Sequence, residues 1–348
     1  MIATAQERIR VATFAAPLSR DGPGLLLRDI GKGDDPQIAA VQAIIDTVAP
    51  NILLLTDFDH DAELVALRAF NDALARPFEH VFSLPGNAGL ATGLDMDGNG
   101  RLGEPRDAQG YGRFLGDGGL ALLTRFPVIT GQMRDFTTLL WADLPGADMP
   151  VTEAGPFPSP EAQAAARLSS TGHWVVPLRI SEDKTLTLLA YSATPPVFDG
   201  PEDRNGLRNR DELRLWVQLL AGTLGPVPDD PLVLLGNTNL DPVDGDGYRD
   251  AMAGLLAHPR LQDPQPQSIG AASAPSPGHS GDPALDTADW REEGPGNLRV
   301  SYVLPSRDLG VAGAGVFWPA PDDPQAALLG EDGLAAGPHR LVWVDIIR

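Results

Sequence analysis

Two asparagines and an aspartate follow a short apolar run in the second half of the chain. Residues 232–235 are Leu-Val-Leu-Leu, and Gly236, Asn237, Thr238, Asn239, Leu240 and Asp241 follow. Four apolar residues that end at turn-forming residues predict a buried strand. Small polar residues beyond such a strand lie at the carboxyl edge of a sheet, where α/β folds bind ligands. Asn237 and Asn239 are therefore candidate site residues.

A second set of oxygen-bearing side chains lies in a glycine-rich stretch, residues 93–104. Asp95, Asp97 and Asn99 alternate, and Gly100 occupies the sixth position, as in the first half of a calcium-binding loop. Alternate residues of a tight turn point to one side, and glycine permits the sharp bend. Arg106 stands at the twelfth position, where such loops carry glutamate, so Asp107 or Glu104 would have to close the shell. The sequence is equally compatible with an acidic surface turn that binds no ion.

Further candidate residues stand at or near the ends of other apolar runs. Asp57 follows residues 51–55, Ser192 follows residues 186–190, Ser301 lies within residues 297–305, and His339 precedes an apolar run near the end of the sequence. His173 stands beside the predicted strand 175–180. It is either a site residue or a histidine with a structural hydrogen-bonding role.

These side chains would be positioned by alternating strands and helices. Residues 8–14 alternate like a strand, and 51–55 are nearly all apolar, which is typical of a strand buried on both faces. Residues 36–48 show helical spacing, with Asp34 or Asp35 as the cap and proline in the first turn. We expect further strands at 118–128, 175–180 and 186–190, further helices at 61–74, 211–220 and 248–257, and loops at 22–30, 139–149, 155–160 and 262–289.

Three stretches resemble the endonuclease/exonuclease/phosphatase (DNase I-like) superfamily. Gly236-Asn237-Thr238-Asn239 is similar to the family's Gly-Asp-x-Asn strand end, and residues 118–128 resemble its central strand. Residues 194–206, Thr-Pro-Pro-Val-Phe-Asp-Gly-Pro-Glu-Asp-Arg-Asn-Gly, resemble a bacterial, secreted branch. The resemblance extends over nearly the whole chain. It implies a four-layer α/β/β/α sandwich of two packed mixed sheets, mostly antiparallel, as a single domain over residues 8–348.

The resemblance also implies roles for the candidate residues, and most of the family's chemical groups are replaced. Asp57 stands where the family has a metal-binding glutamate, Ser192 where it has a phosphate-binding histidine, and Ser301 where it has an aspartate. His339 matches the general base, but Pro338 replaces the aspartate that orients it. Asn239 is retained, whereas Asn237 replaces the aspartate that positions water, and Ala15 replaces an asparagine ligand.

Composition limits the partners. The net charge of −21 disfavours polynucleotides, because their backbones would be repelled. No apolar run approaches the 18 residues of a membrane span, and there is no cysteine. We expect a monomer that binds a small phosphate ester or another small ligand. Residues 1–7, with Ala3 and Ala5 before Gln6, are either a disordered start or the remnant of a secretory signal, and the latter predicts a periplasmic or secreted protein.

These observations predict a family member with a degraded phosphoesterase site, weakly active or a pseudoenzyme. Two alternatives remain open. One is an active phosphoesterase that uses Mg²⁺ or Mn²⁺ in the cleft, with Asp57 and Asp241 or Asp244 as substitute ligands. The other is an extracellular binding module stabilised by Ca²⁺ in the 95–107 loop, held by Asp95, Asp97 and Asn99.

Overall fold

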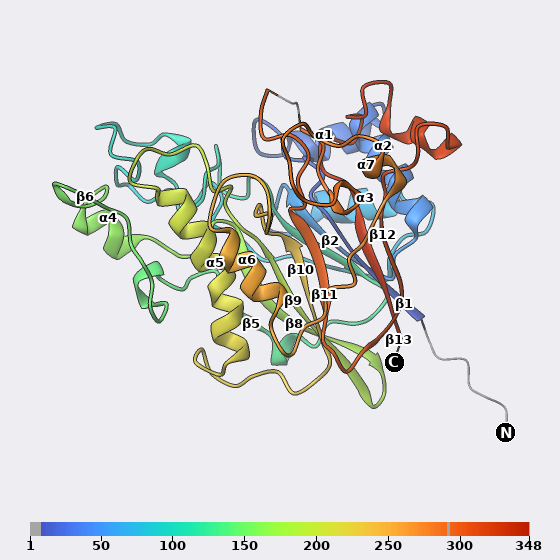
Figure 1. Ribbon diagram of the computed structural model, residues 1–348. Helices are drawn as coiled ribbons and strands as arrows, with labels where there is room; N and C mark the ends of the chain where they lie inside the picture. Colours follow the sequence, from blue (N-terminus) through green and yellow to red (C-terminus); the bar gives the residue numbers. More distant parts are fainter. Residues whose placement is uncertain (1–7, 291–292, 348) are drawn as a thin grey trace.

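Two β-sheets lie at the centre of the computed structural model, which describes residues 8–290 and 293–347 (Figure 1). The first sheet has six strands, and its two outermost members are β12 and β3. In sheet order the strands are β12 (Gly310–Val316), β13 (Val342–Ile347), β1 (Arg8–Phe14), β2 (Ile52–Phe58), β4 (Gly119–Thr124) and β3 (His80–Phe82).

The second sheet has five strands, and β10 is flanked by β9 and β11. Strand pairing is parallel between β1 and β2 and between β9 and β10, and antiparallel between all other neighbours in the two sheets. Both sheets are therefore mixed and mostly antiparallel, as predicted. In sheet order the strands are β11 (Ser301–Pro305), β10 (Leu232–Asn237), β9 (Lys184–Ser192), β8 (Gly172–Ser181) and β5 (Arg134–Asp135).

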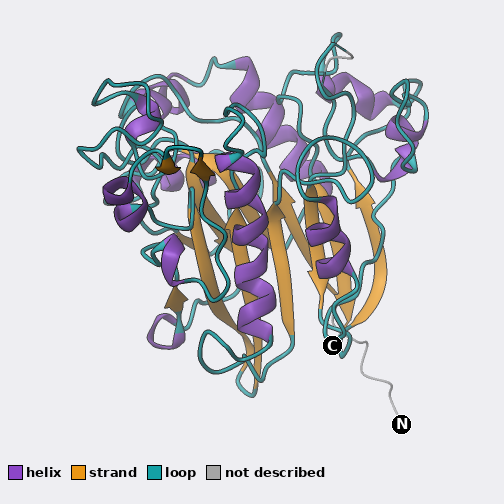
Figure 2. Cartoon of the chain, turned by 60° about the vertical axis from the view of Figure 1, so that its left-hand side comes forward, coloured by secondary structure: helices purple, strands orange, loops and turns teal. Residues whose placement is uncertain are grey.

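Helices cover the outer faces of the two sheets (Figures 1 and 2). Along β10, Val233 and Leu235 belong to the core shared with the first sheet, whereas Leu232 and Leu234 pack with residues of α5 and α6. This alternation explains why the strand is apolar throughout, since both of its faces are buried. The helices are α1 (Leu25–Lys32), α2 (Pro36–Val48), α3 (Val65–Asp72), α4 (Pro160–Ala165), α5 (Arg204–Leu220), α6 (Arg249–Leu256) and α7 (Ile269–Ala272).

The remaining elements are short and lie in the connections. They are the hairpin strands β6 (Val151–Thr152) and β7 (Gly155–Pro156), and the 3₁₀ turns η1 (Pro105–Asp107), η2 (Thr130–Gln132), η3 (Trp141–Asp143), η4 (Pro283–Leu285) and η5 (Pro324–Leu329). Together the layers form the α/β/β/α arrangement predicted from the resemblance.

Several predicted boundaries are wrong. The stretch 22–30, expected to be a loop, contains most of α1, which begins after Gly24 and ends before Gly33, both with positive φ. Glycines in the left-handed conformation bound a helix too short to show a clear periodicity. The helix predicted at 61–74 begins only at Val65, and the helix predicted at 211–220 begins earlier, at Arg204.

The strand predicted at 51–55 extends to Phe58, so Asp57 lies within β2 rather than beyond its end. The pairing of β2 with β4 is irregular between Leu55 and Phe58, and the polar residues Thr56 and Asp57 stand within this irregular stretch.

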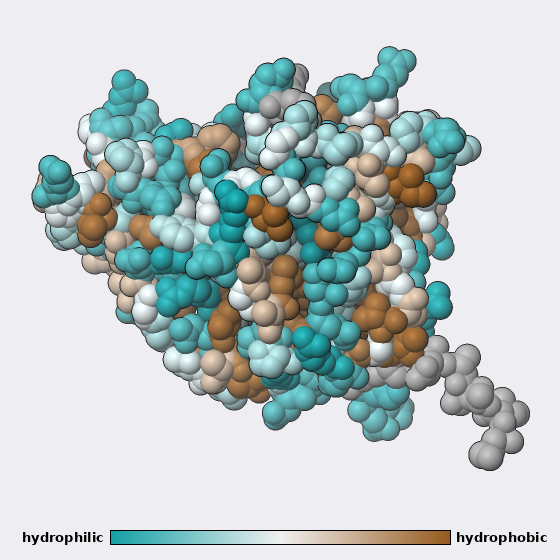
Figure 3. Space-filling view, viewed as in Figure 1, coloured by the Kyte–Doolittle hydropathy of each residue, from teal (hydrophilic) through white to brown (hydrophobic). Residues whose placement is uncertain are grey.

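Two expectations concern the surface and the start of the chain. Residues 1–7, read as a disordered start or a signal remnant, lie outside the described residues. Over the described part of the chain, no helix combines the length and apolarity needed to cross a membrane. On the face seen in Figure 3, hydrophobic residues occur singly or in small groups among hydrophilic ones.

Candidate functional site

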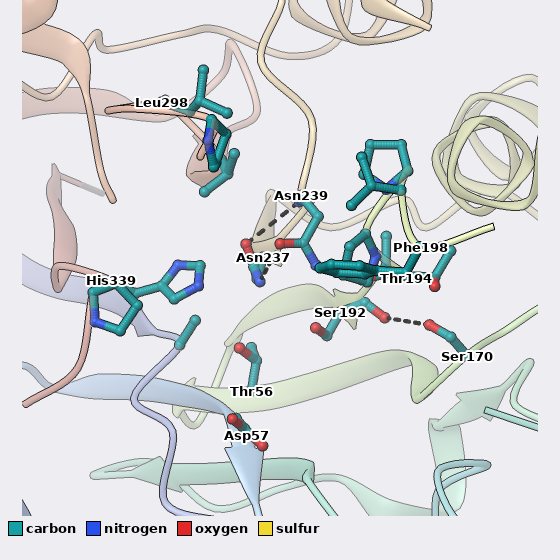
Figure 4. A pocket seen from close by; sticks show the side chains of 18 of the residues that line it. Thr56, Asp57, Ser170, Ser192, Thr194, Phe198, Asn237, Asn239, Leu298 and His339 are labelled. Carbon is teal, nitrogen blue, oxygen red and sulfur yellow. Dashed lines mark hydrogen bonds between the residues drawn. The ribbon is translucent and has the colours of Figure 1, made fainter. Parts of the chain in front are cut away.

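A cavity of about 760 Å³ opens where the ends of β1, β2, β9 and β10 meet. Five predicted site residues line it together, although they come from distant parts of the sequence (Figure 4). They are Asp57, Ser192, Asn237, Asn239 and His339.

Strand pairing places several of these residues side by side at the same end of the sheets. Asn237 is in register with Ser192 of the parallel strand β9 and with Ser301 of the antiparallel strand β11. Gly236 makes the close approach possible, because a Cβ atom there would lie 1.8 Å from the carbonyl oxygen of Tyr191, at a φ of +145°. Ser301 is not among the lining residues. It is buried behind Asn237, and its Oγ has no hydrogen-bond partner among the described residues.

The asparagine pair is held by its own hydrogen bonds. Asn237 Nδ2 donates to Asn239 Oδ1 at 3.1 Å, and Asn239 Nδ2 donates to the carbonyl oxygen of Ala193 at 2.8 Å. The backbone of Asn239 is left-handed, with a φ of +50°, which asparagine tolerates better than most residues. The pair therefore offers uncharged amide groups to the cavity and no carboxylate to activate water.

Asp57 lies at the floor of the cavity, in surroundings that disfavour the charged form of its carboxylate. Within the described chain, its carboxylate has no hydrogen-bond or ion-pair partner. Burial raises its pKa to about 7, the neighbouring carboxylates Asp117 and Asp59 act in the same direction, and Arg20 acts against them. Asp59, in contrast, accepts hydrogen bonds from the backbone N–H groups of Arg20 and Gly118.

His339 stands on the opposite side of the cavity from Ser192 (Figure 4). Its ring packs edge-on against Trp290, with 5.1 Å between centroids, and no described residue forms a hydrogen bond to its Nδ1. Burial, followed by the nearby Arg340, lowers its pKa to about 4. His339 is therefore neutral at pH 7, and Pro338 provides no group to hold its tautomer.

The cavity does not assemble a metal site. In the portion of the chain that is described, no three histidine, aspartate or glutamate residues around this cavity bring ligand atoms together. Asp241 lines the cavity, but its carboxylate accepts hydrogen bonds from the backbone N–H groups of Val243, Asp244 and Arg299. Asp244 is bound to the N–H groups of Ser280 and Gly281. The family-type ligand set for Mg²⁺ or Mn²⁺ therefore does not fit these residues.

Carboxylates do gather in the 95–107 loop. Asp95, Asp97 and Asp107 each offer an oxygen within 4.8 Å of the others, so this acidic cluster could hold a metal ion. Burial, together with the neighbouring carboxylates Asp95 and Asp107, raises the pKa of Asp97. Asp107 supplies the third carboxylate, one of the two options considered from sequence. Asn99 instead donates through its amide to Asp97 and Glu104.

The loop is separate from the strand-end cavity. Asp97 and Asn99 line a neighbouring cavity of about 790 Å³. Tyr111, Thr194, Pro195 and Phe198 line both cavities, so the two cavities adjoin.

His173 is a structural residue in this arrangement. Its ring is fully buried between Tyr191 and Trp216, Nδ1 is 2.7 Å from Ser169 Oγ, and Nε2 is 3.1 Å from the carbonyl oxygen of Glu212. Burial lowers its pKa to about 3. It does not line the cavity, which favours the structural alternative left open by the sequence.

Sequence reasoning missed the polar residues of α5 that hold the cavity wall. Asn209 Nδ2 donates to the carbonyl oxygens of Thr194 and Thr238, which joins the chain segments beyond β9 and β10. Glu212 accepts hydrogen bonds from the N–H groups of Ser170 and Thr194. The available signal was polar residues at helical spacing with the apolar residues of α5 that face the core.

Comparisons with known proteins agree with the fold described above. A model of the endonuclease/exonuclease/phosphatase family matches residues 28–337. No curated protein matches the sequence. Among solved structures, an endonuclease/exonuclease/phosphatase from Beutenbergia cavernae is similar, with 16% identity, a TM-score of 0.54, and coverage of 99% of this chain and 72% of that one.

Two further structures resemble the chain over nearly their full lengths. An endonuclease/exonuclease/phosphatase from Bacteroides vulgatus has 10% identity and a TM-score of 0.52, covering 99% of this chain and 100% of that one. Sphingomyelinase C from Streptomyces griseocarneus has 11% identity and a TM-score of 0.50, covering 97% and 99% respectively. At these identities the likeness concerns the fold alone.

Proposed function

The chain belongs to the endonuclease/exonuclease/phosphatase family, and from this premise we propose that it has a degraded phosphoesterase site that hydrolyses phosphate esters weakly or not at all. Hydrolysis in this fold needs a cation to neutralise phosphate, a general base and donors for the developing charge. The composition of the strand-end cavity carries the proposal.

Each of these requirements is poorly met. Of the described residues that line the cavity, none is lysine or arginine. Asp57 lies near the carboxylates of Asp59 and Asp117, but among the described residues no three ligand-bearing side chains gather at this cavity to hold a metal ion. His339 lacks an orienting carboxylate, and Asn237 cannot take up a proton as an aspartate could. Loss of one member of a catalytic unit commonly lowers the rate by several powers of ten.

The alternative of an active metal-dependent enzyme receives less support. It requires Asp57 to act with Asp241 or Asp244, but the carboxylates of both are occupied by backbone N–H groups. The absence of basic residues from the described cavity lining, together with the net charge of −21, also argues for a small ligand rather than a polynucleotide.

Hydrolysis of a generic phosphomonoester and a generic phosphodiester, with Mg²⁺, Mn²⁺ or Ca²⁺, tests the proposal. We expect the protein to be nearly silent and the double variant Asn237→Asp/Ser301→Asp to gain activity that EDTA removes. A matched control, Ser181→Asp/Gln325→Glu, adds two carboxylates at exposed positions and should gain nothing. Metal-dependent turnover by the unmodified protein would contradict the proposal.

A second function is favoured by the acidic cluster: we propose that Asp95, Asp97 and Asp107 bind Ca²⁺ and stabilise the loop. Extracellular modules bind Ca²⁺ with dissociation constants of roughly 10⁻⁴–10⁻³ M, which suits a periplasmic or secreted protein. At about a hundred times the dissociation constant, Ca²⁺ would add about 2.7 kcal/mol to the free energy of unfolding.

Thermal unfolding in Ca²⁺ and in EDTA tests this second function. The melting temperature should rise with Ca²⁺, and the rise should disappear in Asp97→Asn but persist in Asp183→Asn, which removes one exposed carboxylate from the β8–β9 hairpin. An equal response of both variants would indicate non-specific screening of charge.

A further inference from the structure

The strand-end cavity is lined by acidic side chains and by no basic side chain of the described residues. The acidic ones are Asp57, Asp241 and Asp246. Asp241 is satisfied by three backbone N–H groups, whereas Asp57 has no described hydrogen-bond or ion-pair partner. A phosphate group entering here would meet a carboxylate that no described hydrogen bond or ion pair neutralises, with only the electrostatic influence of Arg20 opposing its charge, and a positively charged group would relieve it.

A buried hydroxyl next to Asp57 also lacks a partner. Thr56 is 4% exposed and lines the cavity, and none of the described residues forms a hydrogen bond to its Oγ1. Figure 4 shows Thr56 and Asp57 on adjacent positions of β2, facing the same space as Ser192 and Asn237. Buried polar atoms are normally satisfied, so an orphan hydroxyl at a cavity wall indicates a missing hydrogen-bonding partner.

The rim of the cavity is aromatic. Tyr111 is 65% exposed and Phe198 is 74% exposed, and Trp290 lines the same cavity. Tyr111, Phe198 and Trp290 line the same cavity rather than standing singly on the surface, and aromatic faces attract cations as well as apolar groups. Val197, Leu298 and Val300 extend the apolar wall.

From these observations we propose that the cavity binds a small organic ammonium ion, with its charged end on Asp57 and Thr56 and its apolar part against Phe198 and Tyr111. A primary ammonium has three N–H donors, one for the Asp57 carboxylate and two for hydroxyl or amide oxygens such as those of Thr56, Ser192 or Asn237. A bare divalent ion is a poorer match, because no three described carboxylate or histidine side chains bring their ligand atoms together at this cavity, and the aromatic rim would be unused. This binding function does not depend on residual hydrolysis.

Calorimetric titration with three small probes tests the proposal. At pH 8 and 0.15 M NaCl, we expect 2-phenylethylammonium to bind at least tenfold more tightly than the neutral 2-phenylethanol, and phenyl phosphate to bind least. Asp57→Asn should weaken binding of the ammonium at least tenfold with little effect on the alcohol. Thr56→Val should weaken binding of the ammonium several-fold. Phe198→Ala should weaken binding of both the ammonium and the alcohol.

Controls separate a built site from general attraction to an acidic protein. Asp183→Asn removes the same charge at an exposed hairpin and should leave all three affinities unchanged. Thermal unfolding of each variant checks that it is folded, and the exposed Phe198 provides a variant with little risk to the core. Equal affinities for the ammonium and the alcohol would overturn the proposal. So would an unchanged affinity in Asp57→Asn, or binding of Mg²⁺ alone that depends on Asp57 without any binding of the ammonium.

Discussion

The carboxylate of Glu212 accepts a hydrogen bond of 2.6 Å from the backbone N–H of Ser170, and this bond ties α5 directly to the wall of the strand-end cavity. Glu212 also binds the Ser170 hydroxyl and the N–H of Thr194. Burial raises the pKa of Glu212 to about 7, against the opposing effect of Arg208.

Removal of the Glu212 carboxylate should therefore destabilise the protein strongly. Glu212→Ala leaves two backbone N–H groups and the Ser170 hydroxyl without their acceptor and removes the negative charge that acts on the buried Arg208, so we expect a loss of about 3–5 kcal/mol in the free energy of unfolding. Urea denaturation measures it. Glu182→Ala, at an exposed turn, should stay within about 0.5 kcal/mol of the parent, and a comparable loss in both variants would refute the role assigned to Glu212.

The buried His173 should make the protein sensitive to acid. Its pKa is lowered from 6.5 to about 3, so the unfolded chain binds more protons between these values, and stability is lost as the pH falls below 6.5. Between pH 8 and pH 5 this amounts to about 2 kcal/mol.

A variant isolates this contribution from the other titrating groups. The difference in unfolding free energy between pH 8 and pH 5 should be about 2 kcal/mol smaller in His173→Gln than in the parent. Denaturant titrations at the two pH values measure it, and His279→Gln, on a loop, controls for the loss of one histidine. An unchanged difference in His173→Gln would show that the ring is protonated without cost in the folded state.

Asp57→Asn should stabilise the protein at neutral pH. The folded pKa of about 7 lies above the ordinary 3.8, so the carboxylate destabilises the fold progressively as the pH rises from 3.8 to 7. The full shift corresponds to about 4 kcal/mol, and because the side chain keeps some contact with solvent we expect a gain of about 1–3 kcal/mol at pH 8. The gain should vanish near pH 4, and a loss of stability at pH 8 would mean that the carboxylate has a stabilising partner.

Two glycine substitutions should have opposite signs. Gly236→Ala places a Cβ atom against the carbonyl oxygen of Tyr191 and should cost about 3 kcal/mol or more, since β9 and β10 must separate. Gly31→Ala, within α1, meets no atom within 4 Å and should stabilise the protein by about 0.5–1 kcal/mol. The melting temperatures of the two variants and the parent test this prediction. An unchanged melting temperature in Gly236→Ala would show that β9 and β10 can move apart freely.

The sequence was informative where burial and spacing dominate. Residues 8–14 and 36–48 were predicted with the bounds that β1 and α2 have, because an alternating strand and a capped amphipathic helix carry their own periodicity. The prediction of a loop at residues 22–30 was wrong, because a short helix between two glycines has too few turns to show its apolar face.

The site was harder to predict than the fold. That Asp57 and His339 face one cavity followed from the family resemblance, but the lack of a partner for Thr56 depends on packing between segments distant in sequence. The occupation of Asp241 by backbone N–H groups is a loop geometry that no local pattern encodes.

The placement of β13 between β1 and β12 has a consequence for synthesis on the ribosome. Arg10 of β1 pairs with Asp345 of β13, 335 positions later, through hydrogen bonds of 2.7 and 2.9 Å. The edge of β1 that pairs with β13 thus stays unoccupied until residues 342–347 have been translated. A strand with an open edge can pair with other chains, so the late completion of this sheet leaves β1 exposed to such pairing during synthesis.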